Sequence, residues 1–197
     1  MREEDYYGFP LEVRLTHHIH LVAFITIALS GFYIHNPINL FGFRSFKWIG
    51  LAHTLSAIFL FASFFFRLYY ALGSGDYVNF SFRREDFPLT KEWLRYYLFL
   101  RSEKPTQRKY NPLQKLTYYT LIFLLILQGL LGITLLGNWN LLLGILGGRQ
   151  SVRTLHFFIA LFLAAIVTLH IYLVFTTDQR LRVSMFTFGP IRRRRTN

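Results

Sequence analysis

Four long stretches without a charged residue restrict the folds open to this chain. They run from Leu15 to Phe43, Trp48 to Phe66, Leu116 to Gly148 and Thr154 to Thr177, and none contains Asp, Glu, Lys or Arg. Each reaches the length of about 20 apolar residues that a transmembrane helix needs. The sequence therefore predicts an all-α polytopic membrane protein, a bundle of four transmembrane helices in a single domain over residues 1–197.

The ends of these helices follow from local signals. We expect helices at about 14–35, 47–71, 112–136 and 152–176, the first ending before Pro37 because the residue before proline disfavours helix. The loop 73–110 contains KEWLRYYLFLR, which predicts an amphipathic helix at the membrane surface. The tail 179–197 ends in RRRR, and we expect it to be solvated or to lie against anionic lipid head groups.

The formal net charge of +12 is unevenly distributed. Ten of the 22 Lys and Arg residues lie between Arg67 and Lys115, six lie between Arg180 and Arg195, and only four lie in the other two connections. By the positive-inside rule, this distribution predicts a multi-pass protein of the inner (cytoplasmic) membrane with both termini and the middle loop in the cytoplasm. Topology thus accounts for the charge, and we expect no nucleic-acid partner.

The chain contains no cysteine. This excludes thioether-bound haem, iron–sulfur clusters and disulfides within the chain. If the protein handles electrons, it must use non-covalent haem or a flavin and receive the electrons from another polypeptide.

Two imidazoles stand in the last apolar stretch, His156 and His170, fourteen positions apart. On an α-helix this spacing places them within roughly 40° of the same side and roughly 21 Å apart along the axis, one near each membrane face. An ionisable side chain in the hydrocarbon of a membrane costs free energy unless it has a binding partner. Two histidines on one side of a helix, one near each end, therefore indicate that each binds a separate partner. Haem iron suits a neutral imidazole in an apolar pocket, with a second histidine from another helix.

The predicted topology sorts the other histidines by depth. His53 falls near the outer face with His156, and three residues of the first helix fall near the cytoplasmic face with His170: His17, His18 and His20. His17 and His20 share one helical face at i, i+3, whereas His18 points about 100° away. Each leaflet is thus predicted to contain one histidine pair.

Four segments between about Glu12 and Asp178 resemble the di-haem b-type cytochrome subunits of membrane-bound NiFe hydrogenases and the related formate dehydrogenase gamma subunits. They are RLTHHIHLVAFITIALSG, KWIGLAHTLSAIF, RKYNPLQK and VRTLHFFIALFLAAIVTLHIYLVF. Two segments, the YLFL of KEWLRYYLFLR and GGRQSVRTLH, look more like the hydrogenase subunits than like the formate dehydrogenase subunits. The first-helix motif places the family's ligand at His17, three residues after Arg14, with His20 as the alternative; His18 stands where the family often has tryptophan.

The resemblance implies a four-helix core with two stacked b haems, whose axial ligands are His17, His53, His156 and His170. Such a subunit takes electrons from a periplasmic-side iron–sulfur small subunit, itself joined to the NiFe large subunit. It passes them to a quinone, menaquinone or ubiquinone, near the inner haem. Asn111 and Gln114 are then the expected quinone contacts. Hydrogen splitting belongs to the partner subunits, so this chain is predicted to be an electron-transfer and quinone-reducing subunit of an oxidoreductase complex.

Arg14 and Arg153 each precede a proposed ligand by three residues, which makes them candidates for haem propionates. Ordinary snorkelling at a helix end is the alternative for both. Capping and loop hydrogen bonds are the alternative for Asn111 and Gln114.

Other functions stay open for the whole chain. It could anchor a formate dehydrogenase or thiosulfate reductase, or act as a stand-alone bacterial cytochrome b561. From a different class, it could be a haem-free structural anchor or a small transporter, with its histidines bonded between helices.

Overall fold

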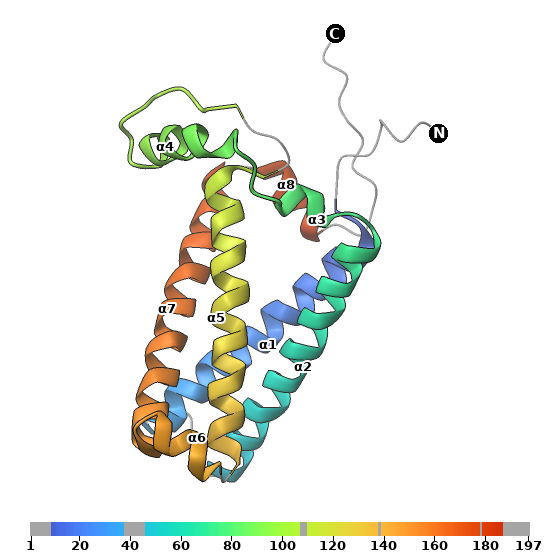
Figure 1. The fold of residues 1–197 in the computed structure, drawn as a ribbon. Coiled ribbons are helices and arrows are strands. Elements are labelled where there is room, and N and C mark those ends of the chain that lie inside the picture. Colours follow the sequence, from blue (N-terminus) through green and yellow to red (C-terminus); the bar gives the residue numbers. More distant parts are fainter. Residues whose placement is uncertain (1–8, 38–45, 107–109, 138, 178, 187–197) are drawn as a thin grey trace. The chain divides into compact units, whose positions relative to one another are not determined.

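The computed structural model describes residues 9–37, 46–106, 110–137, 139–177 and 179–186. Within these residues every regular element is a helix (Figure 1). The helices are α1 (Leu11–His35), α2 (Phe46–Gly73), α3 (Tyr77–Phe80), α4 (Asp86–Tyr97), α5 (Pro112–Leu136), α6 (Asn140–Ile145), α7 (Gly148–Thr177) and α8 (Gln179–Phe186). The predicted all-α class is therefore confirmed.

Four helices, α1, α2, α5 and α7, are long and apolar enough to cross a membrane. They correspond to the four predicted helices, and the largest difference in an end is at α7, which begins at Gly148 rather than at about 152. Gly147 and Gly148 have positive φ angles of 78° and 91°, which end the preceding turn and allow α7 to begin at Gly148. The chain is thus a multi-pass membrane protein.

The chain divides into two compact units, which are described separately. The first contains α1, α2 up to Leu68, α7 from Ala160, and α8. The second contains the end of α2 from Tyr69, α3 to α6, and α7 up to Ile159.

In the first unit, α8 packs against the beginning of α1. The backbone N–H of Phe9 donates to Ser184 Oγ at 2.9 Å, and Ser184 is only 2% exposed. Residues 179–186 of the predicted tail thus form a helix with a buried serine, and the expected position of the tail in solvent or against lipid head groups stays a prediction. The remaining tail, 187–197 with its RRRR run, lies outside the described residues, as do residues 38–45 of the connection between the first two predicted helices.

In the second unit, α4 is the amphipathic helix of the long loop, and it lies crosswise near the N-terminal end of α5 (Figure 1). It covers Asp86–Tyr97, about five residues earlier than the segment that predicted it. The helix cannot continue through that segment because Phe99 has a positive φ of 59°. Trp93, fully buried, anchors its inner side.

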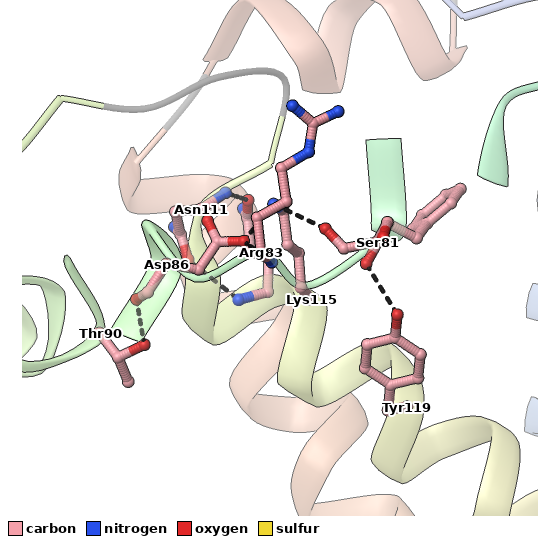
Figure 2. Close-up of polar contacts among 9 residues, drawn as sticks. Ser81, Arg83, Asp86, Thr90, Asn111, Lys115 and Tyr119 are labelled. Atoms are coloured by element: carbon pink, nitrogen blue, oxygen red, sulfur yellow. Dashed lines mark hydrogen bonds and ion pairs between the residues drawn. The ribbon is translucent and has the colours of Figure 1, made fainter. Parts of the chain in front are cut away.

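A buried ion pair fastens this loop to α5 (Figure 2). Lys115 Nζ lies 2.8 Å from Asp86 Oδ2 and donates to the Ser81 carbonyl at 3.1 Å. The backbone N–H of Arg83 donates to the same Asp86 oxygen at 2.6 Å, and the Tyr119 hydroxyl donates to the Phe80 carbonyl at 3.2 Å. These bonds hold the chain between α3 and α4 against the first two turns of α5.

Candidate functional site

His17 lies in the second turn of α1, in the first unit. Its Nδ1 is buried and has no hydrogen-bond partner among the described residues. His170, on the last part of α7, is close enough to interact electrostatically with it, and the Phe186 ring of α8 lies edge-on with its centroid 6.3 Å away. The structure therefore brings together the two residues predicted to form the inner histidine pair.

His18 is directed elsewhere, as helical geometry predicts. Its Nδ1 lies 2.7 Å from the Arg14 carbonyl of its own helix, and its ring meets the Phe186 ring edge-on at 5.3 Å. One nitrogen of His18 is thus engaged with the backbone of α1.

His20, the alternative inner ligand, faces α2 rather than α7. Its ring hydrogen-bonds the backbone of Ser63 and interacts electrostatically with Arg67. Its Nε2 is buried and has no hydrogen-bond partner among the described residues, so the bond to Ser63 uses Nδ1. His17 and His20 thus each have one buried ring nitrogen without a hydrogen-bond partner among the described residues, and the choice between them stays a prediction.

His53 of α2 packs against the last turns of α1, also in the first unit. Its Nδ1 lies 3.0 Å from Ser30 Oγ, and the ring sits beside Gly31, where an added Cβ would come within 3.2 Å of His53 Cε1. A glycine at this position gives the imidazole room that any other residue would reduce.

His156 of α7 has a comparable setting in the second unit. The Gln128 side chain of α5 donates from Nε2 to the His156 carbonyl at 3.1 Å. A Cβ added to Gly132, one turn further along α5, would lie 3.6 Å from His156 Cε1. Gln128 and Gly132 therefore define the position of α7 at this histidine.

These surroundings fit imidazoles that bind a planar cofactor. The histidines lie in apolar helices, two of them beside glycines, and only 11 to 17% of the residues in each apolar window are buried by the protein itself. In the described part of the chain, no three His, Asp or Glu side chains gather as a directly bound metal ion would require. One imidazole on each side of a haem iron needs no such cluster. His17, His53, His156 and His170 are the residues that would hold haem.

The two arginines predicted to meet propionates differ in their surroundings. Arg14 is half-buried in the first turn of α1, and Arg153 is exposed on α7. A different arginine, Arg149, caps α5 by donating to the carbonyls of Leu135 at 2.7 Å and Gly137 at 3.1 Å. The propionate role of Arg14 and Arg153 stays a prediction.

Asn111 and Gln114 form a capping box at the start of α5. Asn111 Oδ1 accepts the Gln114 N–H and Gln114 Oε1 accepts the Asn111 N–H, both at 2.9 Å, while Asn111 Nδ2 donates to Tyr97 Oη at 2.9 Å. Asn111 is fully buried. This is the capping alternative recognised from the sequence, and a quinone contact would require the Asn111 amide to exchange one of these bonds.

Ser30 and Gln128, which contact His53 and His156, were not predicted to have a role. A signal was present for both, because each is a polar residue within an otherwise apolar span. What the sequence could not supply was the partner, since the contacts join residues 23 and 28 positions apart.

Four membrane-length helices with imidazoles held at defined positions are typical of membrane proteins that bind a haem between helices. The prokaryotic cytochrome b561 family matches residues 8–188, and the chain belongs to this family. None of the curated proteins compared with the chain gives a significant match. The predicted resemblance to membrane b-type cytochromes is confirmed: the chain is a membrane cytochrome b of electron transfer, and its family implies haem b binding.

Proposed function

We propose that this chain is the membrane-anchoring, di-haem cytochrome b subunit of a respiratory NiFe hydrogenase. In this role it accepts electrons from a periplasmic-side iron–sulfur small subunit, which is joined to the NiFe large subunit, and delivers them to menaquinone or ubiquinone near the cytoplasmic side. The observation that carries the proposal is the family match over residues 8–188 in a chain whose membrane helices hold histidines at two depths.

The proposed ligands are His17 with His170 for the inner haem and His53 with His156 for the outer haem. Haem b, when bound, supplies reversible one-electron redox chemistry at its iron. The protein supplies the imidazoles and their orientation, and it excludes water from the iron with apolar helices. Electrostatic proximity of His17 and His170 supports the inner pair, and the glycines beside His53 and His156 support these two as ligands.

Arg14 and Arg153 are proposed to bind haem propionates, because arginine forms charge-assisted bonds with carboxylates and each stands one turn before a proposed ligand. Asn111 and Gln114 are proposed to border the quinone site at the start of α5. Support for this location comes from the buried network around Asn111, which fixes the position of polar groups beside a membrane helix end.

The proposed location is the inner membrane, with both termini and the loop that contains α4 in the cytoplasm, as the distribution of Lys and Arg indicates. The four membrane-length helices bury few of their residues within the protein, so most of their apolar surface can contact lipid, cofactors and partner subunits.

One competing function is favoured by a specific observation. The matched family is described as prokaryotic cytochrome b561, a description that also fits a stand-alone cytochrome acting on quinone without a hydrogenase. A formate dehydrogenase or thiosulfate reductase anchor differs from the proposed subunit mainly in its donor.

The first test is a reduced-minus-oxidised spectrum of the purified chain with a pyridine haemochrome count. Two b haems per polypeptide are expected, and His156→Ala and His170→Ala should each remove about one haem. Retention of both haems in the double variant would refute the ligand assignment. Reduction of the haems by hydrogen in the intact complex would support the hydrogenase partner, whereas reduction by formate alone, or isolation of an active single chain, would reject it.

A further inference from the structure

Ser30 is a buried hydroxyl near the end of α1, only 8% exposed. Its Oγ lies 2.5 Å from the carbonyl oxygen of Thr26, 3.1 Å from that of Ile27, and 3.0 Å from His53 Nδ1. Two of these three neighbours can only accept a hydrogen bond, and the hydroxyl has a single proton to share among them.

The distances decide where that proton lies. Two oxygens separated by 2.5 Å require a proton between them, so the hydroxyl donates to the Thr26 carbonyl. The Ser30 oxygen therefore faces His53 as an acceptor, and the proton of the 3.0 Å contact must come from Nδ1 of the imidazole. A neutral imidazole with its proton on Nδ1 presents its lone pair at Nε2.

We propose that Ser30 is a positioning residue that holds His53 in the Nδ1–H tautomer, so that Nε2 is the nitrogen that would bind haem iron. This inference rests on the proposed function, since it takes His53 as a haem ligand. Metal-bound histidines commonly donate the other ring N–H to a fixed acceptor, which sets the tautomer and raises the basicity of the ligand. In this chain the neighbouring membrane helix offers two acceptors, the Ser30 hydroxyl and the Ile27 carbonyl.

Gly31 completes the arrangement from the next position on α1. The ring of His53 lies against its Cα, at the point where a Cβ would approach Cε1 to 3.2 Å. Ser30 thus supplies the acceptor while Gly31 supplies the space, and together they define the rotation of the imidazole. The Ile27 backbone also interacts with this ring, so the hydroxyl acts together with a carbonyl on the same side of α1.

Loss of the Ser30 acceptor has a definite consequence for the iron. An Nδ1–H bond shifts electron density toward Nε2 and stabilises ferric over ferrous iron. Removal of the hydroxyl should raise the midpoint potential of one haem and leave that of the other unchanged. The Ile27 carbonyl remains in the variant, so the haem should stay bound.

The decisive comparison is Ser30→Thr against Ser30→Val in the full chain, because the two side chains have the same shape and differ only in the hydroxyl. Thr26→Val is the matched control: it removes a hydroxyl one turn earlier, which bonds the Val22 carbonyl of its own helix. The readouts are haem count, potentiometric titration of each haem, and the electron paramagnetic resonance of the oxidised protein.

We expect Ser30→Thr and Thr26→Val to behave as the parent, and Ser30→Val to shift one midpoint upward and to change one low-spin ferric signal. If Ser30→Val loses a haem that Ser30→Thr keeps, the inference also stands. Equal midpoints and signals in the two Ser30 variants, or equal haem loss in both, would overturn it. Failure of the proposed function gives a different result, since His53→Ala would then keep the parental haem count.

Discussion

The strongest prediction from the second unit is that Lys115→Met releases the loop between α3 and α4 from α5. The Lys115 side chain is 3% exposed and its partner carboxylate, on Asp86, is 10% exposed, so the pair is almost fully removed from solvent. The substitution keeps the aliphatic length of the lysine but removes the cation. It leaves the Asp86 carboxylate with the Arg83 N–H at 2.6 Å as a remaining donor.

The size of the expected destabilisation follows from a property of buried ion pairs: removing one charge costs much more stability than removing both. Removal of the cation from a buried ion pair destabilises by about 3–5 kcal/mol. At the lower limit, the fraction of molecules with an open loop should rise about 100-fold, since about 1.4 kcal/mol corresponds to a factor of ten. Removal of both charges, by Lys115→Met with Asp86→Leu, should recover much of that loss, because the buried carboxylate is then removed together with the cation.

Chymotryptic cleavage after Trp93 measures this opening, because Trp93 is 0% exposed and must leave its site before it can be cut. We expect cleavage of the Lys115→Met protein to be roughly 100-fold faster. Lys91→Met, the same chemical change at an exposed position of α4, should have no effect. Cleavage at the parental rate in Lys115→Met would refute the anchoring role of the pair.

Three further outcomes follow from the site. His17→Ala should remove about one haem per chain while His20→Ala keeps both, as a pyridine haemochrome count will show; the opposite pattern would transfer the ligand role to His20. Asn111→Ala should slow quinone reduction with both haems retained. Asn111→Ser keeps an N-cap acceptor worth about 1 kcal/mol but also lacks the amide, so equal slowing in the two variants indicates a lost quinone contact, whereas slowing only in the less stable Asn111→Ala indicates a lost cap. Gln128→Leu removes the side-chain donor to the His156 carbonyl, which should cost about 1 kcal/mol of stabilisation at this histidine. The expected result is faster transfer of one haem to an apo-acceptor protein. Haem dissociation at the parental rate would show that this hydrogen bond does not support haem binding.

The membrane helices could be predicted from the sequence because their signal is local. A run without charged residues predicts a membrane-spanning helix, and Pro37 predicts the end of the first one. The spacing of Asn111 and Gln114 permits the capping box that begins α5 in the structure. The direction of His18, away from His17 and His20, also followed from helical geometry alone.

The elements that sequence reasoning missed depend on distant partners. Lys115 looked like one of ten basic residues in a cytoplasmic region, and its pairing with Asp86 joins positions 29 apart in the chain. Ser30 found its partner on another helix for the same reason. The end of α4 was misplaced because a single backbone angle, the positive φ of Phe99, interrupts a segment whose side chains favour helix.

The contact between α8 and the start of α1 has a consequence for biosynthesis. Phe186 belongs to the last described segment of the chain and its ring lies against His17 and His18, which belong to the first membrane helix. These surroundings therefore stay incomplete until translation has passed residue 186. Under the proposed assignment of His17 as a haem ligand, haem that arrives during translation would meet an imidazole that α8 does not yet cover, and docking of α8 would then close that end of α1.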